Sequence, residues 1–467
     1  MHTHKCIYIH IICVYNHVSM KVHISDHFTY SKILRMTAFP IVMMVFISLY
    51  SIVDGVFIAN FTEGGDAFAA VNLVFPFIMI IGSIGFMMGT GGTAYVSKLL
   101  GEKNHEKANK SFSLIVYATI ALGVIFSIGG YFLIEPIVKA MASISIDATE
   151  KMIADAILYG KILICGQVVF MLQNVFQSFF LVAEKGKLGF LFTVSAGVTN
   201  MALDALLIAG LRMGVTGAAI ATVMGYVVGG VGPLLYFIFK RDGIICLGKT
   251  DVDFKIIGRS AYNGMSEFIG NISMSVVSIV YNAQLLKAYG QNGIIAYGVI
   301  MYVSFVFLSI FIGYSLGMAP AVGYNYGAKN KEELHNILTK SMMVIGITSI
   351  IMIIFSIVTA VPLSKIFSNG DDSLADLTLY AIRVYSIVYL VVGFSIYISS
   401  FFTALNNGTI SAVCSISRTL IFQVAFAFIL PLIFSSNSLW WAIVTGEIMS
   451  FLMCVGFLLI NKKKYGY

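Results

Sequence analysis

Long apolar runs alternate with short polar stretches along nearly the whole chain. A helix needs about 20 apolar residues to cross about 30 Å of hydrocarbon, and twelve runs reach that length. The pattern therefore predicts an all-α polytopic membrane protein with twelve transmembrane helices. The predicted spans are 33–58, 68–93, 111–134, 156–180, 188–209, 214–239, 258–286, 293–318, 341–361, 377–404, 408–433 and 439–460.

Two pairs of sequence echoes divide these spans into two halves. The stretch GEKNHE at 101–106 returns as GAKNKE at 327–332, 226 positions later. The stretch LVAEKGKLG before the fifth span returns as FTALNNGTI before the eleventh, 222 positions later. Two parallel six-helix repeats, which place a substrate path between them, follow from this spacing. We expect an extension at 1–29, disordered or the product of a wrongly assigned start, an N-lobe at 30–239, a cytoplasmic linker at 240–257 and a C-lobe at 258–467.

Composition supports a membrane protein and sets the extension apart. Of the 467 residues, 58% are hydrophobic and 11% are charged, whereas soluble domains carry about 25% charged residues. The first nineteen residues hold four of the eight histidines and two of the six cysteines. They are either a His/Cys metal tract or translated from a start upstream of the true one at Met20. The six cysteines contain no Cys-x-x-Cys pair, so they indicate neither a disulfide framework nor a zinc site.

The basic residues gather in alternate loops. With the N-terminus inside, the cytoplasmic segments hold 21 of the Lys and Arg residues and the outer loops hold 7. By the positive-inside rule, we expect a cell-membrane protein with both termini in the cytoplasm. The net charge of +7 does not indicate nucleic-acid binding, because the basic residues form no continuous stripe.

Four carboxylates interrupt the apolar runs, at Asp54, Asp204, Glu267 and Glu447. A charged side chain at the bilayer centre costs about 2.5–3.5 kcal/mol even on the lenient insertion scale. Such residues usually face a cavity and mark ion or substrate pathways. Their number predicts a transporter that handles protons, metal ions or cationic substrates.

In the N-lobe, Asn200 and Asp204 are four residues apart and share one helix face. Asp54 and Thr222 lie at compatible depths in the outer half of the same bundle. Two carboxylates, an amide oxygen and a hydroxyl suit a hard cation such as Na⁺, and two close acids can also share a proton. The alternatives are a purely structural hydrogen bond between Asp204 and Asn200 and an Asp54 that snorkels to the surface.

In the C-lobe, Glu267 precedes a polar run that indicates a wet helix face, which favours substrate or cation binding. Arg418 is the basic residue inside the eleventh predicted span. It can pair with Glu267 or with Glu447, and spacing alone leaves the partner open. For Glu447, a structural ion pair and a functional role remain equal alternatives.

At these positions the chain resembles the multidrug and toxic compound extrusion (MATE) family. The resemblance runs from about residue 30 to 460 and rests on six motifs in order. They are SLYSIVDGVFIAN, GTGGTAYVSKLLGEKNHEKA, NMALDALLIAGLRMGVTGAAIAT, NGMSEF, MAPAVGYNYGAKN and ISRTLIF. The resemblance implies a V-shaped fold of two lobes that exports organic cations in exchange for Na⁺ or H⁺. It implies a cation site at the positions of Asp54, Asn200, Asp204 and Thr222, and a coupling or drug-binding role for Glu267. Gly55 stands where many members have Thr.

We therefore predict a secondary active multidrug antiporter that works as a monomer. It takes small organic cations or other amphipathic drugs as substrates and needs no cofactor beyond the coupling ion. A flippase for a lipid-linked substrate is the alternative, although one intramembrane Arg among four acids favours cationic substrates. The loop signature of a major-facilitator transporter is missing, and neither pore-lining residues nor a catalytic constellation of an enzyme can be found.

Overall fold

The computed structural model describes residues 22–61, 66–143, 149–240, 243–368, 370–434 and 438–467, and no strand occurs among them. The N-terminal half contains α2 (Tyr30–Phe61), α3 (Asp66–Gly101), α4 (His105–Ala142), α5 (Glu150–Cys165), α6 (Gln167–Val182), α7 (Gly186–Asp204), η1 (Ala205–Gly210) and α8 (Gly214–Phe239). The C-terminal half contains α9 (Phe254–Asn263), α10 (Met265–Tyr289), α11 (Gln291–Gly327), α12 (Lys331–Ser368), α13 (Asp372–Ser386), α14 (Val388–Ala404), α15 (Gly408–Ile416), η2 (Ser417–Ile421), α16 (Phe422–Ile433) and α17 (Leu439–Tyr465).

Helix number agrees with the sequence pattern. Ten helices in the described part are long and apolar enough to cross a membrane, and two bent pairs bring the number to twelve. The pair α5 and α6 bends by 54° and the pair α13 and α14 by 45°. The predicted span at 258–286 is also divided, because a turn at Gly264 separates α9 from α10. The breaks are invisible in the apolar pattern, which continues through each of them.

The internal repeat is reproduced in backbone detail. Lys103 and Lys329, at equivalent places in the two echoes, both take the left-handed conformation, with φ of 58° and 56°. The side chains of Asn104 and Asn330 then cap α4 and α12 in the same way, accepting backbone N–H groups three residues later. The second echo behaves likewise, since Glu184 and Asn406 have φ of 57° and 58°. The two halves are therefore parallel repeats of one architecture.

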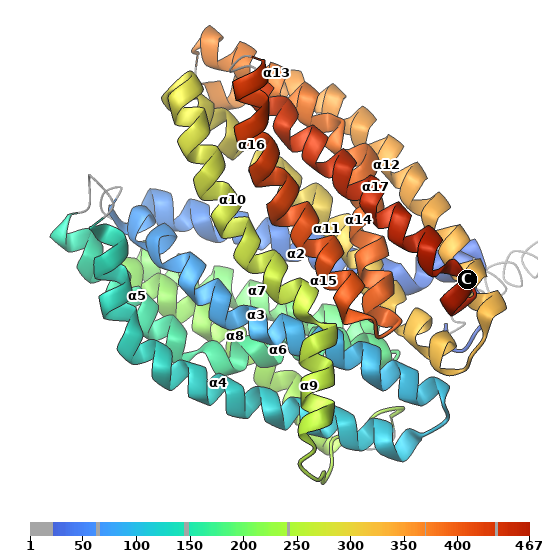
Figure 1. Ribbon diagram of the computed structural model, residues 1–467. Coiled ribbons are helices and arrows are strands. Elements are labelled where there is room, and N and C mark those ends of the chain that lie inside the picture. The colour runs from blue at the N-terminus through green and yellow to red at the C-terminus, as the bar shows by residue number, and fades with distance from the viewer. Residues whose placement is uncertain (1–21, 62–65, 144–148, 241–242, 369, 435–437) are drawn as a thin grey trace, which may run out of the picture.

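The two halves form lobes that diverge toward one end (Figure 1). We call the end where α3 and α11 terminate the closed end, and the end near α5 and α13 the open end. Two helices cross between the lobes: α2 packs against α11, and α10 packs against α3. The expected V shape is thus present, and it is closed where the two sequence echoes lie.

Glycines make the closed end tight. A Cβ added at Gly101 would overlap the carbonyl oxygen of Tyr324, and one at Gly327 would overlap that of Lys98. Each glycine therefore lets the backbone of α3 approach the backbone of α11. The contact between the lobes depends on main chain, not on long side chains.

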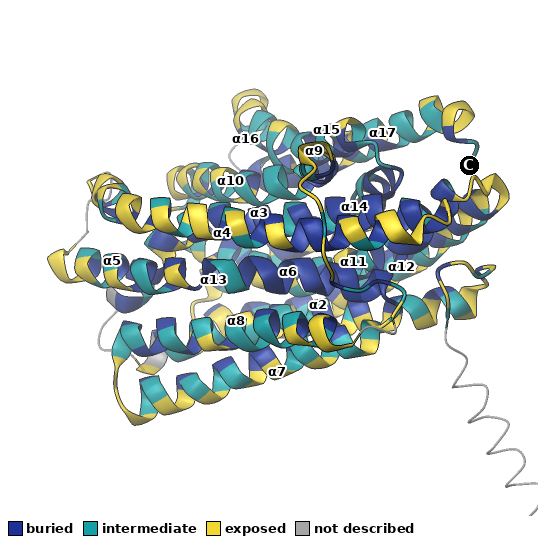
Figure 2. Ribbon diagram, turned by 90° about the horizontal axis from the view of Figure 1, so that it is seen from below, coloured by how far each residue is buried: buried dark blue, intermediate teal, exposed yellow. Residues whose placement is uncertain are grey.

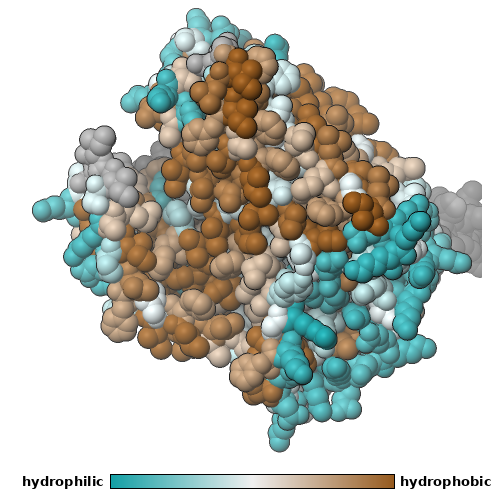
Figure 3. Space-filling view, in the orientation of Figure 1, coloured by the Kyte–Doolittle hydropathy of each residue, from teal (hydrophilic) through white to brown (hydrophobic). Residues whose placement is uncertain are grey.

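The surface divides into an apolar band and a polar end. Figure 3 shows apolar side chains over most of the visible face, with hydrophilic ones gathered toward the end that carries the C-terminus. Figure 2 shows exposed residues along α7 and α4, while α6 is largely buried. This distribution is what a helical bundle in a bilayer requires, since lipid contacts the outer helices.

The N-terminal segment is only partly outside the fold. Residues 1–19, with their histidines and cysteines, lie outside the described residues. Residues 22–29, which we assigned to an extension, instead pack at the closed end: Ile24 is 3% exposed and Phe28 is fully buried. Their apolar side chains join the cores of the N-lobe and C-lobe, respectively. In the linker, residues 246–250 run along α4, to which Cys246 and Gly248 donate backbone hydrogen bonds.

Candidate functional site

The four residues expected to form a cation site come together inside the N-lobe. Asp54 lies on α2, Asn200 and Asp204 lie on the last turns of α7, and Thr222 lies on α8. The carboxyl group of Asp54 neighbours both the Asp204 carboxyl group and the Asn200 amide. Asp204 is fully buried, and Asn200 is 4% exposed. The proximity expected from spacing along one helix and from depth on two others is therefore present, and the role of these residues as a cation site stays a prediction.

This cluster holds oxygen atoms that no protein group satisfies. Buried atoms without a hydrogen-bond partner among the described residues include both carboxyl oxygens of Asp204, one of Asp54, the Asn200 amide oxygen and the Thr222 hydroxyl. An unsatisfied buried polar group costs about 1–3 kcal/mol, and a charged one costs more. A proton shared by the two acids, or a hard cation bound by oxygen, would satisfy these atoms.

A tyrosine completes the cluster. Tyr159 on α5 is 3% exposed, lies within electrostatic range of Asp54 and Asp204, and neighbours Thr222. Sequence reasoning missed it, because an aromatic residue in an apolar helix carries no signal that separates a site residue from a core residue. A transition-metal centre is not indicated, since no group of three His, Cys, Asp or Glu side chains occurs in the part of the chain that the structure describes.

The C-lobe acids are separated from one another, with Arg418 between them. Nη1 of Arg418 lies 3.8 Å from Oε1 of Glu447, and the Arg418 side chain is 21% exposed. Gln423 donates from Nε2 to the same oxygen at 3.2 Å, and Tyr281 in turn donates to Gln423. The open question of the arginine's partner is answered for this conformation: Arg418 pairs with Glu447. The other carboxyl oxygen of Glu447 is buried without a partner among the described residues.

Glu267 lies in the first turn of α10, directly after the break at Gly264. It lines a cavity of about 170 Å³ between the lobes, together with Arg418 and Asn271. Hydroxyl groups from both lobes also line it, among them Thr93 on α3, whose hydroxyl is buried and has no partner among the described residues. The cavity is smaller than the roughly 300–1,000 Å³ of drug-sized sites. It therefore suits water or a small ion in this conformation.

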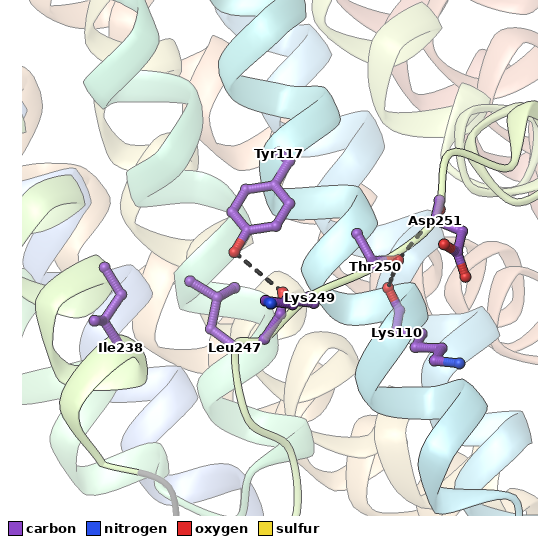
Figure 4. A pocket seen from close by; sticks show the side chains of 8 residues that line it. Lys110, Tyr117, Ile238, Leu247, Lys249, Thr250 and Asp251 are labelled. Carbon is purple, nitrogen blue, oxygen red and sulfur yellow. Dashed lines mark hydrogen bonds between the residues drawn. The ribbon is translucent and has the colours of Figure 1, made fainter.

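A larger hollow lies elsewhere and contains none of these residues. It has a volume of about 760 Å³ and lies between α4, the end of α8 and the linker. Figure 4 shows Tyr117 donating to the Gly248 carbonyl at 3.1 Å and Thr250 donating to the Lys110 carbonyl at 2.9 Å. This hollow is an open surface groove formed where the linker lies on α4. None of the four intramembrane acids lines it, so it is not the site of the predicted chemistry.

Known proteins resemble this chain over nearly its whole length. The family model MatE matches residues 40–206 and 268–429. The multidrug export protein MepA of Staphylococcus saprophyticus is 25% identical over 423 residues, which cover 90% of each chain. MepA of Staphylococcus haemolyticus is also 25% identical, over 91% of this chain and 92% of its own.

Solved structures share the fold. A multidrug resistance MATE family transporter in its outward-facing conformation superposes with a TM-score of 0.89 at 21% identity, covering 96% of this chain and 99% of its own. A MOP superfamily transporter from Pyrococcus furiosus superposes with a TM-score of 0.86 at 21% identity, covering 94% and 98%. The family model covers most of both lobes, and its two matched segments fall one in each repeat. The resemblance of the sequence motifs is confirmed, and the chain belongs to the MatE family.

Proposed function

We propose that this protein is a secondary active multidrug efflux antiporter, which exports organic cations or other amphipathic drugs in exchange for Na⁺ or H⁺. It is a transporter and not an enzyme, and we propose that it works as a monomer. The observation that carries the proposal is the N-lobe cluster of Asp54, Asn200, Asp204 and Thr222, whose buried and unsatisfied oxygens call for a cation.

The repeat architecture supports alternating access. Two parallel lobes that meet at one end and diverge at the other can rock around a central path. With the closed end in the cytoplasm, the diverging lobes open to the outside, and both termini are cytoplasmic by the positive-inside rule. The cation site would then lie within the N-lobe, where a bound cation can favour one arrangement of the two lobes over the other.

The charges of the central cavity favour a cationic substrate over a lipid-linked pyrophosphate. Among the described residues that line the cavity, Arg418 is the basic one and Glu267 is the acidic one. Because Arg418 already pairs with Glu447, the cavity presents no unpaired cation to a phosphate group. The flippase alternative is therefore less well supported.

The decisive experiment is export of ethidium from proteoliposomes under separately imposed Na⁺ and pH gradients. Wild type would be compared with Asp204→Asn, which removes a charge from the cluster at almost constant volume. Asp376→Asn is the matched control, because Asp376 is an exposed acid on α13, outside both lobes' charged clusters. We expect gradient-driven export by wild type and the control, and loss of coupled export in Asp204→Asn.

The outcomes separate the function from the site. Full activity of Asp204→Asn would remove that residue from the coupling site. Absence of export under either gradient, with the wild type correctly inserted, would instead point to a lipid-linked or anionic substrate. Which of the two gradients drives export names the coupling ion.

A further inference from the structure

The short segment His23–Phe28, with the sequence HISDHF, makes the same kind of contact twice, once to each lobe. In each contact a histidine ring and the following backbone N–H bind the two oxygens of one glutamate. The segment precedes α2 and lies at the closed end. Its two histidines are four positions apart and were not part of any predicted site.

The first contact holds the N-lobe. Nδ1 of His23 lies 2.5 Å from Oε2 of Glu184, and the backbone N–H of Ile24 donates to Oε1 at 2.8 Å. Glu184 lies in the turn between α6 and α7, in the left-handed conformation. Its side chain is only 12% exposed. The segment therefore provides hydrogen-bond partners that water would otherwise provide to this carboxylate.

The second contact holds the C-lobe. Nδ1 of His27 lies 2.6 Å from Oε2 of Glu333 at the start of α12, and the backbone N–H of Phe28 donates to Oε1 at 2.8 Å. The carbonyl oxygen of Phe28 accepts from Asn336 at 2.9 Å and from Lys340 at 2.7 Å. The buried Phe28 ring anchors the segment in the C-lobe core.

We propose that residues 23–28 are a latch that holds the closed end of the transporter shut by binding Glu184 of one lobe and Glu333 of the other. Ile24 and Phe28 are four residues apart, so a fully extended chain joins their contacts over at most about 14 Å. Separation of the lobes beyond that reach breaks one contact. The latch rests on the proposed function only in requiring that the lobes separate at this end.

A latch with two contacts in series has a distinctive energetic signature. Removing either contact abolishes the contribution of the latch to closure, because the remaining one joins the segment to a single lobe. The Glu184→Ala, Glu333→Ala and double variants should therefore have nearly equal effects. Two independent stabilising contacts would instead add.

The test measures the distance between the lobes at the closed end. Spin labels at Lys107→Cys on α4 and His335→Cys on α12, both exposed, would be placed in a chain whose six native cysteines are replaced. Double electron–electron resonance on the full chain in lipid nanodiscs then gives the ratio of short to long distances. No drug or ion gradient is needed, so a failed latch can be told apart from a failed antiporter.

Glu332→Ala is the matched control, because Glu332 is an exposed acid that directly precedes Glu333 on α12 and lies outside the latch segment. We expect each glutamate variant, and the double variant, to lower the short-to-long ratio by about tenfold, the size expected for losing hydrogen bonds to a charged group. His23→Ala and His27→Ala, whose rings are partly exposed, repeat the test without disturbing a helix. Unchanged ratios in all four single variants, additive effects in the double variant, or an equal change in Glu332→Ala would each overturn the latch.

Discussion

Replacement of Gly327 by alanine should shift the protein away from the conformation described here. The Cβ of Gly327→Ala would overlap the carbonyl oxygen of Lys98 on α3, in the other lobe. This clash exists only while α3 and α11 are apposed at the closed end. The substitution therefore acts on the balance between conformations and leaves the structure of each lobe intact.

The size of the effect follows from the contact. Overpacking a close contact costs about 1–3 kcal/mol, and a backbone carbonyl cannot rotate away as a flexible side chain can. The gain in helix stability from Gly to Ala, about 0.5–1 kcal/mol, applies to both conformations and cancels in their ratio. Since 1.4 kcal/mol is a factor of ten, the closed-to-separated ratio should fall by about 5- to 150-fold.

The same labels at Lys107 and His335 report this ratio. Gly298→Ala is the matched control, because Gly298 is on the same helix and a Cβ there meets nothing within 4 Å. We expect a long-distance population in Gly327→Ala and a wild-type distribution in Gly298→Ala. A wild-type distribution in Gly327→Ala would refute the view that backbone contact limits closure at this end.

Three further changes test the charged sites. Arg418→Gln should lower the free energy of unfolding by about 3 kcal/mol, because it leaves the buried carboxylate of Glu447 unpaired. Adding Glu447→Gln should restore most of the loss, and thermal unfolding in detergent checks both; no loss in the single variant would contradict the ion pair's structural role. Gly55→Thr should increase the Na⁺ dependence of export by adding a hydroxyl beside Asp54. A Cβ at this position meets only one ring atom, at 4.0 Å. Gly55→Ala controls for side-chain volume, and an equal change in both variants would show that the hydroxyl is not the cause. Tyr159→Phe should weaken cation binding by about three- to tenfold, as expected for one lost hydrogen bond of about 1 kcal/mol. The measurement is ²²Na⁺ binding or the pH profile of export. If both are unaltered, the tyrosine only packs against its neighbours.

The sequence pattern was sufficient to predict features that depend on residues close together in the chain. Apolar runs of bilayer length located the spans, and the two echoes at 101–106 and 327–332 located the repeats. The cluster of Asp204 and Asn200 followed from helix periodicity. These features depend on the spacing of residues along one element, so no knowledge of packing was needed.

Features that depend on contacts between elements were not predictable. The partner of Arg418 depends on how η2 packs against α17, and spacing allowed either glutamate. Tyr159 joins the cluster only because α5 packs against α8. The segment at 23–28 was assigned to the extension because its polar sequence with two histidines does not reveal that Glu184 and Glu333, far away in the sequence, bind it.

The wide turn η2 has a consequence for the C-lobe ion pair. Arg418 and Gln423 are five residues apart, and in a regular α-helix five steps of about 100° would place them about 140° apart around the axis. A π-turn, with hydrogen bonds from residue i+5 to residue i, winds more widely and brings residues five apart closer to one face of the helix. This registration lets both side chains reach the same oxygen of Glu447. Glu447 therefore contacts both Arg418, as an ion pair, and Gln423, as a hydrogen-bond donor, only while η2 is wound as a π-turn. Tightening the turn by one residue would remove one of these two partners.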